Sequence, residues 1–220
     1  GLYVADFFLM PLAYGYIDIE KLLNHSEELM RINKNSHYYN EEYNALEQDH
    51  KLLVDAIKRN WFTFFLQPKV DLKTNKVSCS ESLVRMVHPT YGVISPAKII
   101  PILEKNKMVS VVDFYVLELV CKRLKKWQKK GKEVVPISVN YSRITLLEKD
   151  VVERTINIIN KYGIDKNLIE IEITETEFME SVSIFSNSLL KLRQHGFKVA
   201  MDDFGKEYSS ISLLVDNKFN

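Results

Sequence analysis

The segment LIEIEIT, residues 168–174, alternates isoleucine with glutamate or threonine. Side chains along a β-strand point to opposite faces in turn, so this segment predicts a strand with its isoleucines on one face. Glu170, Glu172 and Thr174 then share the other face. The isoleucine face suits a covering helix, whereas the acidic face must point elsewhere. The segment therefore predicts one strand of a sheet that is covered by helices.

Predicted strands and helices alternate on both sides of this segment. The strands are residues 134–141, 168–174 and 197–203, and the helices between them are residues 150–162 and 182–195, each followed closely by a glycine. Each strand–helix unit takes about thirty residues, which is typical of βαβ units in a parallel sheet. The pattern predicts an α/β fold.

An antiparallel pair of strands precedes these units. Residues 62–72 and 76–87 are two strand-like runs around the turn-forming tetrapeptide KTNK. Ser95 and Pro96 suit the first positions of a helix, and Gly131 suits the end of another. The further helices are expected at residues 19–35, 45–60, 95–106 and 111–130.

The composition excludes several classes of partner. The chain has 220 residues, with 30 basic and 29 acidic side chains, and this balance gives no field that would attract a nucleic acid polymer or an anionic membrane. The apolar run at residues 1–16 is too short for a membrane-spanning helix. Cys79 and Cys121 form no CxxC pattern and indicate reduced thiols in a cytoplasmic protein, with a disulfide as the alternative. A start at Gly1 without Met suggests a piece of a longer protein.

Polar side chains gather near the C-terminal ends of the predicted parallel strands. Asn140, Glu172 and Asp202 lie there, at the end where a (β/α) barrel carries its active site. Glu81, on the second strand of the antiparallel pair, can join them. Oxygen ligands alone suit Mg²⁺ or Mn²⁺. Asp203 could hold a second ion about 4 Å away, which is the arrangement for in-line phosphoryl chemistry.

A structural role is the alternative for each of these residues alone. A glutamate at a strand end, such as Glu172, often caps a helix or forms a salt bridge. Packing alone does not readily explain four oxygen ligands from four separate strands. The convergence therefore favours a cation site over a purely structural barrel.

Several ordered motifs resemble those of the EAL domain family. ESLVR at residues 81–85 resembles its Glu-x-Leu-x-Arg signature. The other similar motifs, in the family's order, are FLQPKVDL (65–72), HPTYGVISPAKIIPILE (88–104), SVNYS (138–142), IEIEITET (169–176) and MDDFG (201–205). The resemblance covers residues 46–220.

The resemblance implies a fold and an activity. EAL domains are TIM-like (β/α) barrels that hydrolyse cyclic di-GMP to pGpG by in-line attack with two divalent metals, Mg²⁺ or Mn²⁺. Residues 46–220 are then an EAL-type barrel with an antiparallel first strand pair that lacks about its last three strands. The exposed edge of such a sheet could pair with another chain, so a homodimer is a further expectation.

Carried over residue by residue, the resemblance implies a ligand set. Glu81, Asn140, Glu172 and Asp202 hold one metal, and Asp203 holds the other with Asp202 as a bridge. The catalytic residues are Glu172, Asp202, Asp203 and Glu175.

Further residues are implied to contact the substrate or its surroundings. Gln67 and Arg85 contact cyclic di-GMP, with the guanidinium of Arg85 at a phosphate. Glu175 steadies the loop after Asp203. A surface salt bridge is the alternative for Arg85.

Residues 1–45 resemble the tail of a GGDEF (diguanylate cyclase) domain, which predicts a small α+β remnant before the barrel. The parent is then a GGDEF–EAL signalling protein in the cytoplasm, with room for a membrane or sensory region upstream.

Two departures from the family leave an alternative open. The loop DFGKEYSS, residues 203–210, has Lys206 and Glu207 where the family has a small residue and then Gly. The family's later lysine and acids would lie beyond Asn220, so the 220-residue chain by itself is expected to be inactive. The alternative is a degenerate EAL domain that acts as a cyclic di-GMP receptor or a protein-interaction module.

Overall fold

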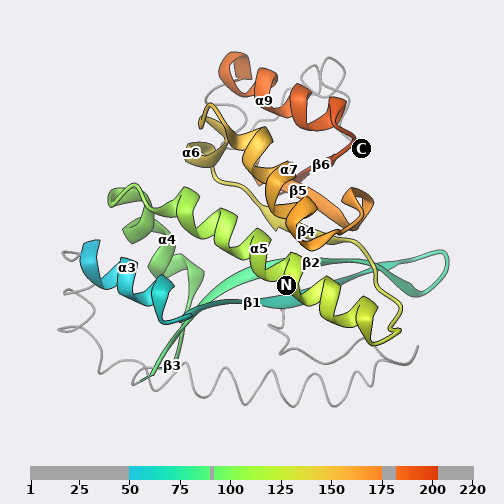
Figure 1. The fold of residues 1–220 in the computed structure, drawn as a ribbon, viewed down its shortest axis with the longest axis horizontal. Coiled ribbons are helices and arrows are strands. Elements are labelled where there is room, and N and C mark those ends of the chain that lie inside the picture. Colours follow the sequence, from blue (N-terminus) through green and yellow to red (C-terminus); the bar gives the residue numbers. More distant parts are fainter. Residues whose placement is uncertain (1–49, 90–91, 175–181, 203–220) are drawn as a thin grey trace.

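The computed structural model describes residues 50–89, 92–174 and 182–202, which form one sheet and the helices packed on it (Figure 1). The predictions for residues 1–45, Glu175, Asp203, Lys206 and Glu207 lie outside the described residues. No helix of the described ranges is long and apolar enough to cross a membrane.

The sheet contains the strands that the sequence predicts, in the order β1-β2-β4-β5-β6. β1 (Phe62–Asp71) and β2 (Lys76–His88) are antiparallel, whereas β4 (Ile137–Asn140), β5 (Ile169–Thr174) and β6 (Lys198–Asp202) continue from β2 in parallel. A further strand, β3 (Gly92–Ile94), pairs with β2 and was not predicted. Its three residues are too few to show an alternating pattern.

The helices connect and cover these strands. They are α3 (His50–Lys58), α4 (Pro96–Lys105), α5 (Val109–Lys129), α6 (Arg143–Leu146), α7 (Val151–Tyr162), the 3₁₀ turn η2 (Lys166–Leu168) and α9 (Val182–Gln194). Pro96 is at the first position of α4, as predicted, although the Ser95 side chain makes no capping hydrogen bond. Gly163 ends α7 at φ 56°, in the left-handed region that favours glycine. The short elements α6 and η2 were not predicted.

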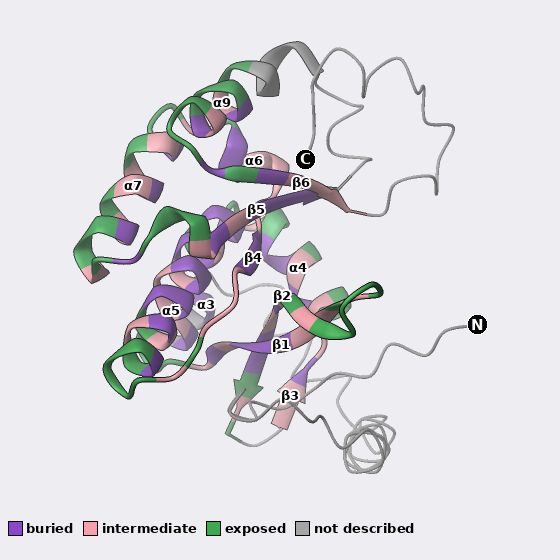
Figure 2. Cartoon of the chain, turned by 90° about the vertical axis from the view of Figure 1, so that its right-hand side faces the viewer, coloured by how far each residue is buried: buried purple, intermediate pink, exposed green. Residues whose placement is uncertain are grey.

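The core lies between the sheet and the helices on one of its faces. Figure 2 shows α5, α7 and α9 on one side of the strands, with buried residues along the contact. Ile169, Ile171 and Ile173 of β5 are all buried, which confirms the apolar face predicted from their alternation. Cys79 and Cys121 are both free thiols, as predicted. The polar face of the same strands is consequently left for the site.

Leu117 of α5 tests this packing because its side chain is completely buried. We expect Leu117→Ala to lower the free energy of unfolding by about 2–5 kcal/mol, since it removes apolar contacts and leaves a cavity. Urea denaturation followed by circular dichroism measures the change. Leu190→Ala is the control, because Leu190 is 55% exposed. Equal effects of the two substitutions would contradict the proposed core.

Candidate functional site

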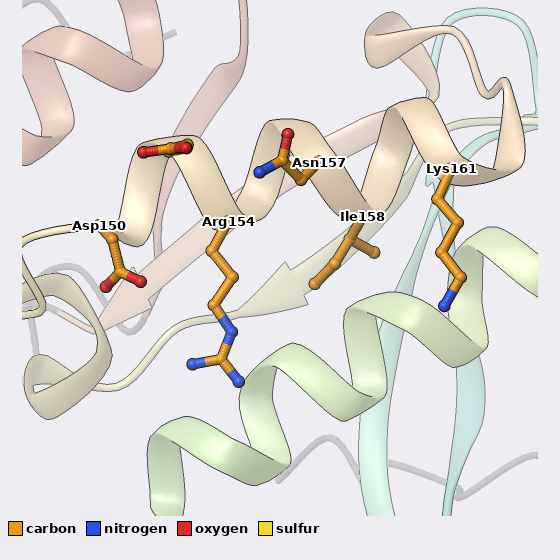
Figure 3. Close-up of a pocket in the computed structure, with 6 residues that line it drawn as sticks. Asp150, Arg154, Asn157, Ile158 and Lys161 are labelled. Carbon is orange, nitrogen blue, oxygen red and sulfur yellow. The ribbon is translucent and has the colours of Figure 1, made fainter.

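A hollow along α7 has the chemistry of an ordinary helix surface. It is lined by Asp150, Glu153, Arg154, Asn157, Ile158 and Lys161 (Figure 3). The Arg154 guanidinium is already engaged, 3.4 Å from a carboxylate oxygen of Glu148 and stacked 4.0 Å from the ring centre of Phe114. None of the predicted site residues lines this hollow.

The four predicted ligands within the described residues lie instead on the polar face of the sheet, on the adjacent strands β2, β4, β5 and β6. Asn140 of β4 is in register with Glu172 of β5. Glu81 of β2 is in register with Ser138, two residues before Asn140. Asp202 of β6 is in register with Thr174, two residues after Glu172. The set therefore runs diagonally across the strands, as expected where strands tilt around a barrel.

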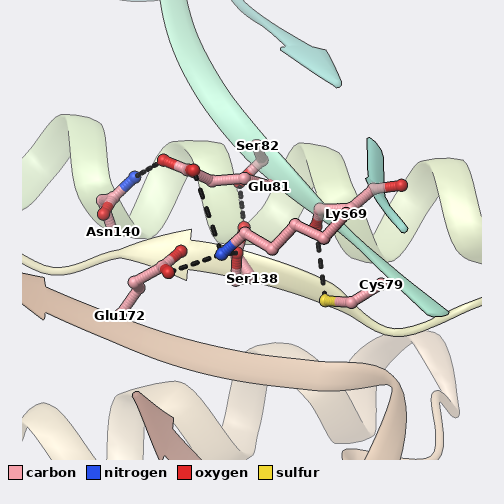
Figure 4. A network of polar contacts seen from close by, with 8 residues as sticks. Lys69, Cys79, Glu81, Ser82, Ser138, Asn140 and Glu172 are labelled. Atoms are coloured by element: carbon pink, nitrogen blue, oxygen red, sulfur yellow. Dashed lines mark hydrogen bonds and ion pairs between the residues drawn. The ribbon is translucent and has the colours of Figure 1, made fainter. Parts of the chain in front are cut away.

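Two of the predicted ligands are in direct contact. The amide nitrogen Nδ2 of Asn140 donates a hydrogen bond of 3.0 Å to Oε1 of Glu81 (Figure 4). These residues are 59 positions apart in the sequence, so the sheet alone brings them together. This contact supports the predicted convergence of β2 and β4.

Lys69 of β1 lies beside Glu81 and Glu172 and joins them and Asn140 in one cluster, which sequence reasoning did not predict. Its ammonium Nζ lies 2.5 Å from Oε1 of Glu172 and 3.9 Å from Oε2 of Glu81 (Figure 4). The hydroxyl of Ser138 is 3.5 Å away. A signal was present: Lys69 follows Gln67 by two residues, and Gln67 is in register with Glu81, so strand parity places Lys69 on the site face.

Burial controls the charges of this cluster. Glu172 is 3% exposed, and no hydrogen-bond partner reaches its Oε2 atom from the described residues. Burial raises the pKa of Glu81, and the charges of Glu172 and Asp202 add to this increase, against the opposing effects of Asn140 and Lys69. Burial also acts to lower the pKa of Lys69, but the hydrogen bond to Glu172 and the carboxylate charges outweigh it, so the pKa of Lys69 is raised.

The loop after Asn140 is fixed by hydrogen bonds to neighbouring elements. The backbone N–H of Tyr141 donates to the carbonyl of Glu172 at 2.9 Å. Asp113 of α5 accepts from the N–H of Ser142 at 2.9 Å and from the hydroxyl of Thr145 at 2.6 Å. The covering helix thus holds the end of β4, and with it the position of Asn140.

The two predicted substrate residues lie on β1 and β2. Arg85 is 4% exposed, which does not fit the surface salt bridge considered as its alternative. Its guanidinium donates to the carbonyl of Val84 at 2.8 Å and lies 5.2 Å from the ring centre of Phe65. Gln67 is half-buried and in register with Glu81. Their contact with a substrate remains a prediction.

The cluster has the side-chain oxygens of a cation site, but its acids are not drawn together as metal ligands are. No three of the described His, Cys, Asp and Glu side chains lie close enough together to hold a metal. However, one buried oxygen of Glu172 has no hydrogen-bond partner among the described residues, and Asn140 contributes a neutral oxygen. The negative charge of Asp202 also acts to raise the pKa of Glu81. An ammonium already lies between two of the carboxylates. These donors fit a hard divalent ion.

Comparison with known proteins identifies the family. The sequence matches the EAL domain over residues 50–220. The chain belongs to the EAL domain family. It is 31% identical over 157 residues to the cyclic di-GMP phosphodiesterase PA2567 of Pseudomonas aeruginosa, covering 70% of this chain and 26% of that protein. The cyclic di-GMP phosphodiesterase NbdA of the same organism is 30% identical over 162 residues, or 74% of this chain and 21% of NbdA.

Solved structures of EAL domains share the fold. The PaMucR phosphodiesterase in complex with c-di-GMP is 26% identical with a TM-score of 0.71, covering 76% of this chain and 68% of that one. The Klebsiella pneumoniae BlrP1 complex with calcium and cyclic di-GMP is 26% identical with a TM-score of 0.59, covering 70% and 38%. The described sheet and its helices are therefore part of a TIM-like EAL barrel.

The raised pKa of Glu81 predicts a pH dependence of stability. A carboxyl whose folded pKa exceeds its unfolded value contributes stability below the unfolded pKa, about 4.3 for Glu, and loses it as the pH rises through the folded pKa. Glu81→Gln does not ionise and keeps an acceptor for Asn140. In EDTA, we expect the unfolding free energy of Glu81→Gln minus that of the wild type to become more positive from about pH 3 to about pH 7.

Urea denaturation across this pH range measures the difference. Glu153→Gln is the control for the loss of one negative charge, because Glu153 is exposed on α7. A difference for Glu81→Gln that stays constant or becomes more negative as the pH rises would contradict the burial of this carboxyl.

Proposed function

We propose that this EAL domain hydrolyses cyclic di-GMP to pGpG with two divalent cations, Mg²⁺ or Mn²⁺. The observation that carries the proposal is the cluster of Glu81, Asn140 and Glu172, which joins three strands at the polar face of the sheet. Relatives that are cyclic di-GMP phosphodiesterases, and a related structure with bound c-di-GMP, support this substrate.

Five acidic or amide side chains of the chain would hold the two cations. Glu81, Asn140, Glu172 and Asp202 would hold one cation, and Asp203 with Asp202 the second. Bound divalent cations supply positive charge against the developing phosphoryl charge and lower the pKa of coordinated water. Water would add in line to one phosphorus while the bond from that phosphorus to one ribose oxygen breaks. One proton of the water would end on the departing ribose oxygen, so the cyclic dinucleotide opens to the linear form.

The remaining residues would position the substrate and the loop. Arg85 would bind a phosphate through its guanidinium, and Gln67 would contact the nucleotide nearby. Glu172, Asp202, Asp203 and Glu175 would be the catalytic residues. Among them, Glu175 would hold the loop that follows Asp203.

The wider organisation is also a proposal. Residues 1–45 would be the end of a GGDEF-like domain, and residues 46–220 would belong to the EAL domain of a cytoplasmic signalling protein. The matched part of the chain spans 26% of the length of PA2567 and 21% of that of NbdA. β1 and β6 end the described sheet, and either edge could serve a homodimer.

A receptor without turnover is the second candidate. Lys206 and Glu207 stand where the family has a small residue and then Gly, and the loss of that Gly removes the freedom to adopt a positive φ. The ion pair between Lys69 and Glu172 also favours this candidate, because it satisfies part of the site without a metal.

Glu172→Ala distinguishes the enzyme from the receptor in the purified full-length parent protein. We expect turnover of cyclic di-GMP to fall about 100-fold or more, because the substitution removes a ligand and leaves the other acids around a weakly held cation. Chromatography of pGpG in the presence of Mg²⁺ or Mn²⁺ measures turnover, and calorimetry measures cyclic di-GMP binding. Glu170→Ala is the matched control, since Glu170 lies on the same strand and the same face, two residues before Glu172.

Two results would contradict the proposal. Wild-type turnover with Glu172→Ala equally fast would show that this cluster is not the catalytic site. Binding of cyclic di-GMP by the wild type with no pGpG formed would support the receptor.

A further inference from the structure

We propose that Lys69 is an internal counter-ion that competes with divalent cations for the carboxylates of Glu81 and Glu172. Its ammonium would leave when a cation binds, so Lys69 sets the apparent cation affinity of the domain. The proposal rests on the cation site of the proposed function and adds a residue that controls it.

The contacts of Lys69 are those of a cation shared between two acids. Nζ lies 2.5 Å from Glu172 and 3.9 Å from Glu81, with the hydroxyl of Ser138 at 3.5 Å (Figure 4). Glu172 is 3% exposed and Glu81 has a side chain only 13% exposed, so water cannot fully compensate their charges. Without an ammonium between them, the two carboxylates would repel each other across a poorly solvated gap.

The ammonium satisfies this pair only in part. Glu172 uses Oε1 for Lys69, whereas its buried Oε2 has no hydrogen-bond partner within the described residues. Buried charged oxygens without partners are unfavourable, and such an atom is expected to take a ligand. A divalent ion carries twice the charge of lysine and can accept several oxygens at once. Such an ion would provide a partner for Oε2 of Glu172, which Lys69 does not contact.

Lysine and the divalent ion cannot share the position. Two positive charges within a few ångströms in a partly buried site repel strongly. The ammonium would therefore have to move away from Oε1 of Glu172 for that oxygen to bind a metal.

Lys69 is placed so that it can move. Its side chain is 39% exposed, unlike the buried side chain of Glu172. The pairing of β1 with β2 shifts register between Lys69 and Val70, where the regular ladder is interrupted. A lysine stem with four rotatable bonds can rotate from such a position into water without disturbing the core.

Competition of this kind multiplies the apparent cation affinity by the fraction of molecules whose carboxylates are free of the ammonium. If the ammonium holds the carboxylates in nine molecules of ten, the apparent Kd for the cation rises about tenfold. Removing the ammonium should restore that factor. The same removal should destabilise the cation-free protein, because it leaves two carboxylates uncompensated.

Titration of the 220-residue chain with MnCl₂ alone tests the proposal. We expect Lys69→Met to bind Mn²⁺ about tenfold more tightly than the wild type by calorimetry. In EDTA its Tm should be lower than that of the wild type, and Mn²⁺ should raise it by a larger amount. Lys76→Met is the matched control, because it removes an exposed lysine from the same pair of strands. Lys69→Gln, which keeps a donor for Glu172, replaces Lys69→Met if the latter does not fold.

The outcomes separate this inference from the proposed function. Equal or weaker Mn²⁺ affinity in the Lys69 variants, with clear binding by the wild type, would overturn the role of Lys69 and leave the cation site intact. No Mn²⁺ binding by the wild type or by any variant would overturn the cation site itself. Tighter binding by Lys76→Met, to the same degree, would show a general charge effect and overturn the inference.

Discussion

A carboxylate that is 3% exposed must be bonded or neutralised, because burying an isolated charge is highly unfavourable. Glu172 sets this constraint on the EAL domain, and the chain meets it with Lys69, which is 103 positions earlier. The ion pair joins the central parallel strand β5 to the antiparallel strand β1. Glu81 and Asn140 complete the cluster from the two strands between them. The site is therefore also a set of contacts that ties the first strands to the later ones.

The two faces of the sheet divide structure from function. On β5 the isoleucines face the covering helices and are buried, while Glu172 faces the other way. The helices still influence the polar face, because Asp113 of α5 holds the loop that follows Asn140. A rigid apolar layer behind the strands thus keeps polar groups in place in front of them.

Much of this arrangement could be predicted from strand parity. The strand-like runs predicted the five strands on the main path of the sheet, and the turn between the first two predicted its antiparallel start. Parity also placed Glu81 and Asn140 on one face, where the structure joins them by a hydrogen bond. Parity does not fix which residue of one strand lies beside which residue of the next. Asp202 lies two residues beyond the position that is in register with Glu172. β3 was missed because three residues carry no periodicity, and Lys69 because a lysine in a strand usually points to solvent.

Anomalous diffraction from crystals of the domain grown with Mn²⁺ and cyclic di-GMP tests the central claim most directly. The account predicts a manganese peak on the polar face of the sheet, within about 2.5 Å of oxygens from Glu81, Asn140 and Glu172. It also predicts that the ammonium of Lys69 no longer contacts Glu172. A well-ordered structure with cyclic di-GMP bound, no manganese at this cluster and the ion pair intact would contradict the account.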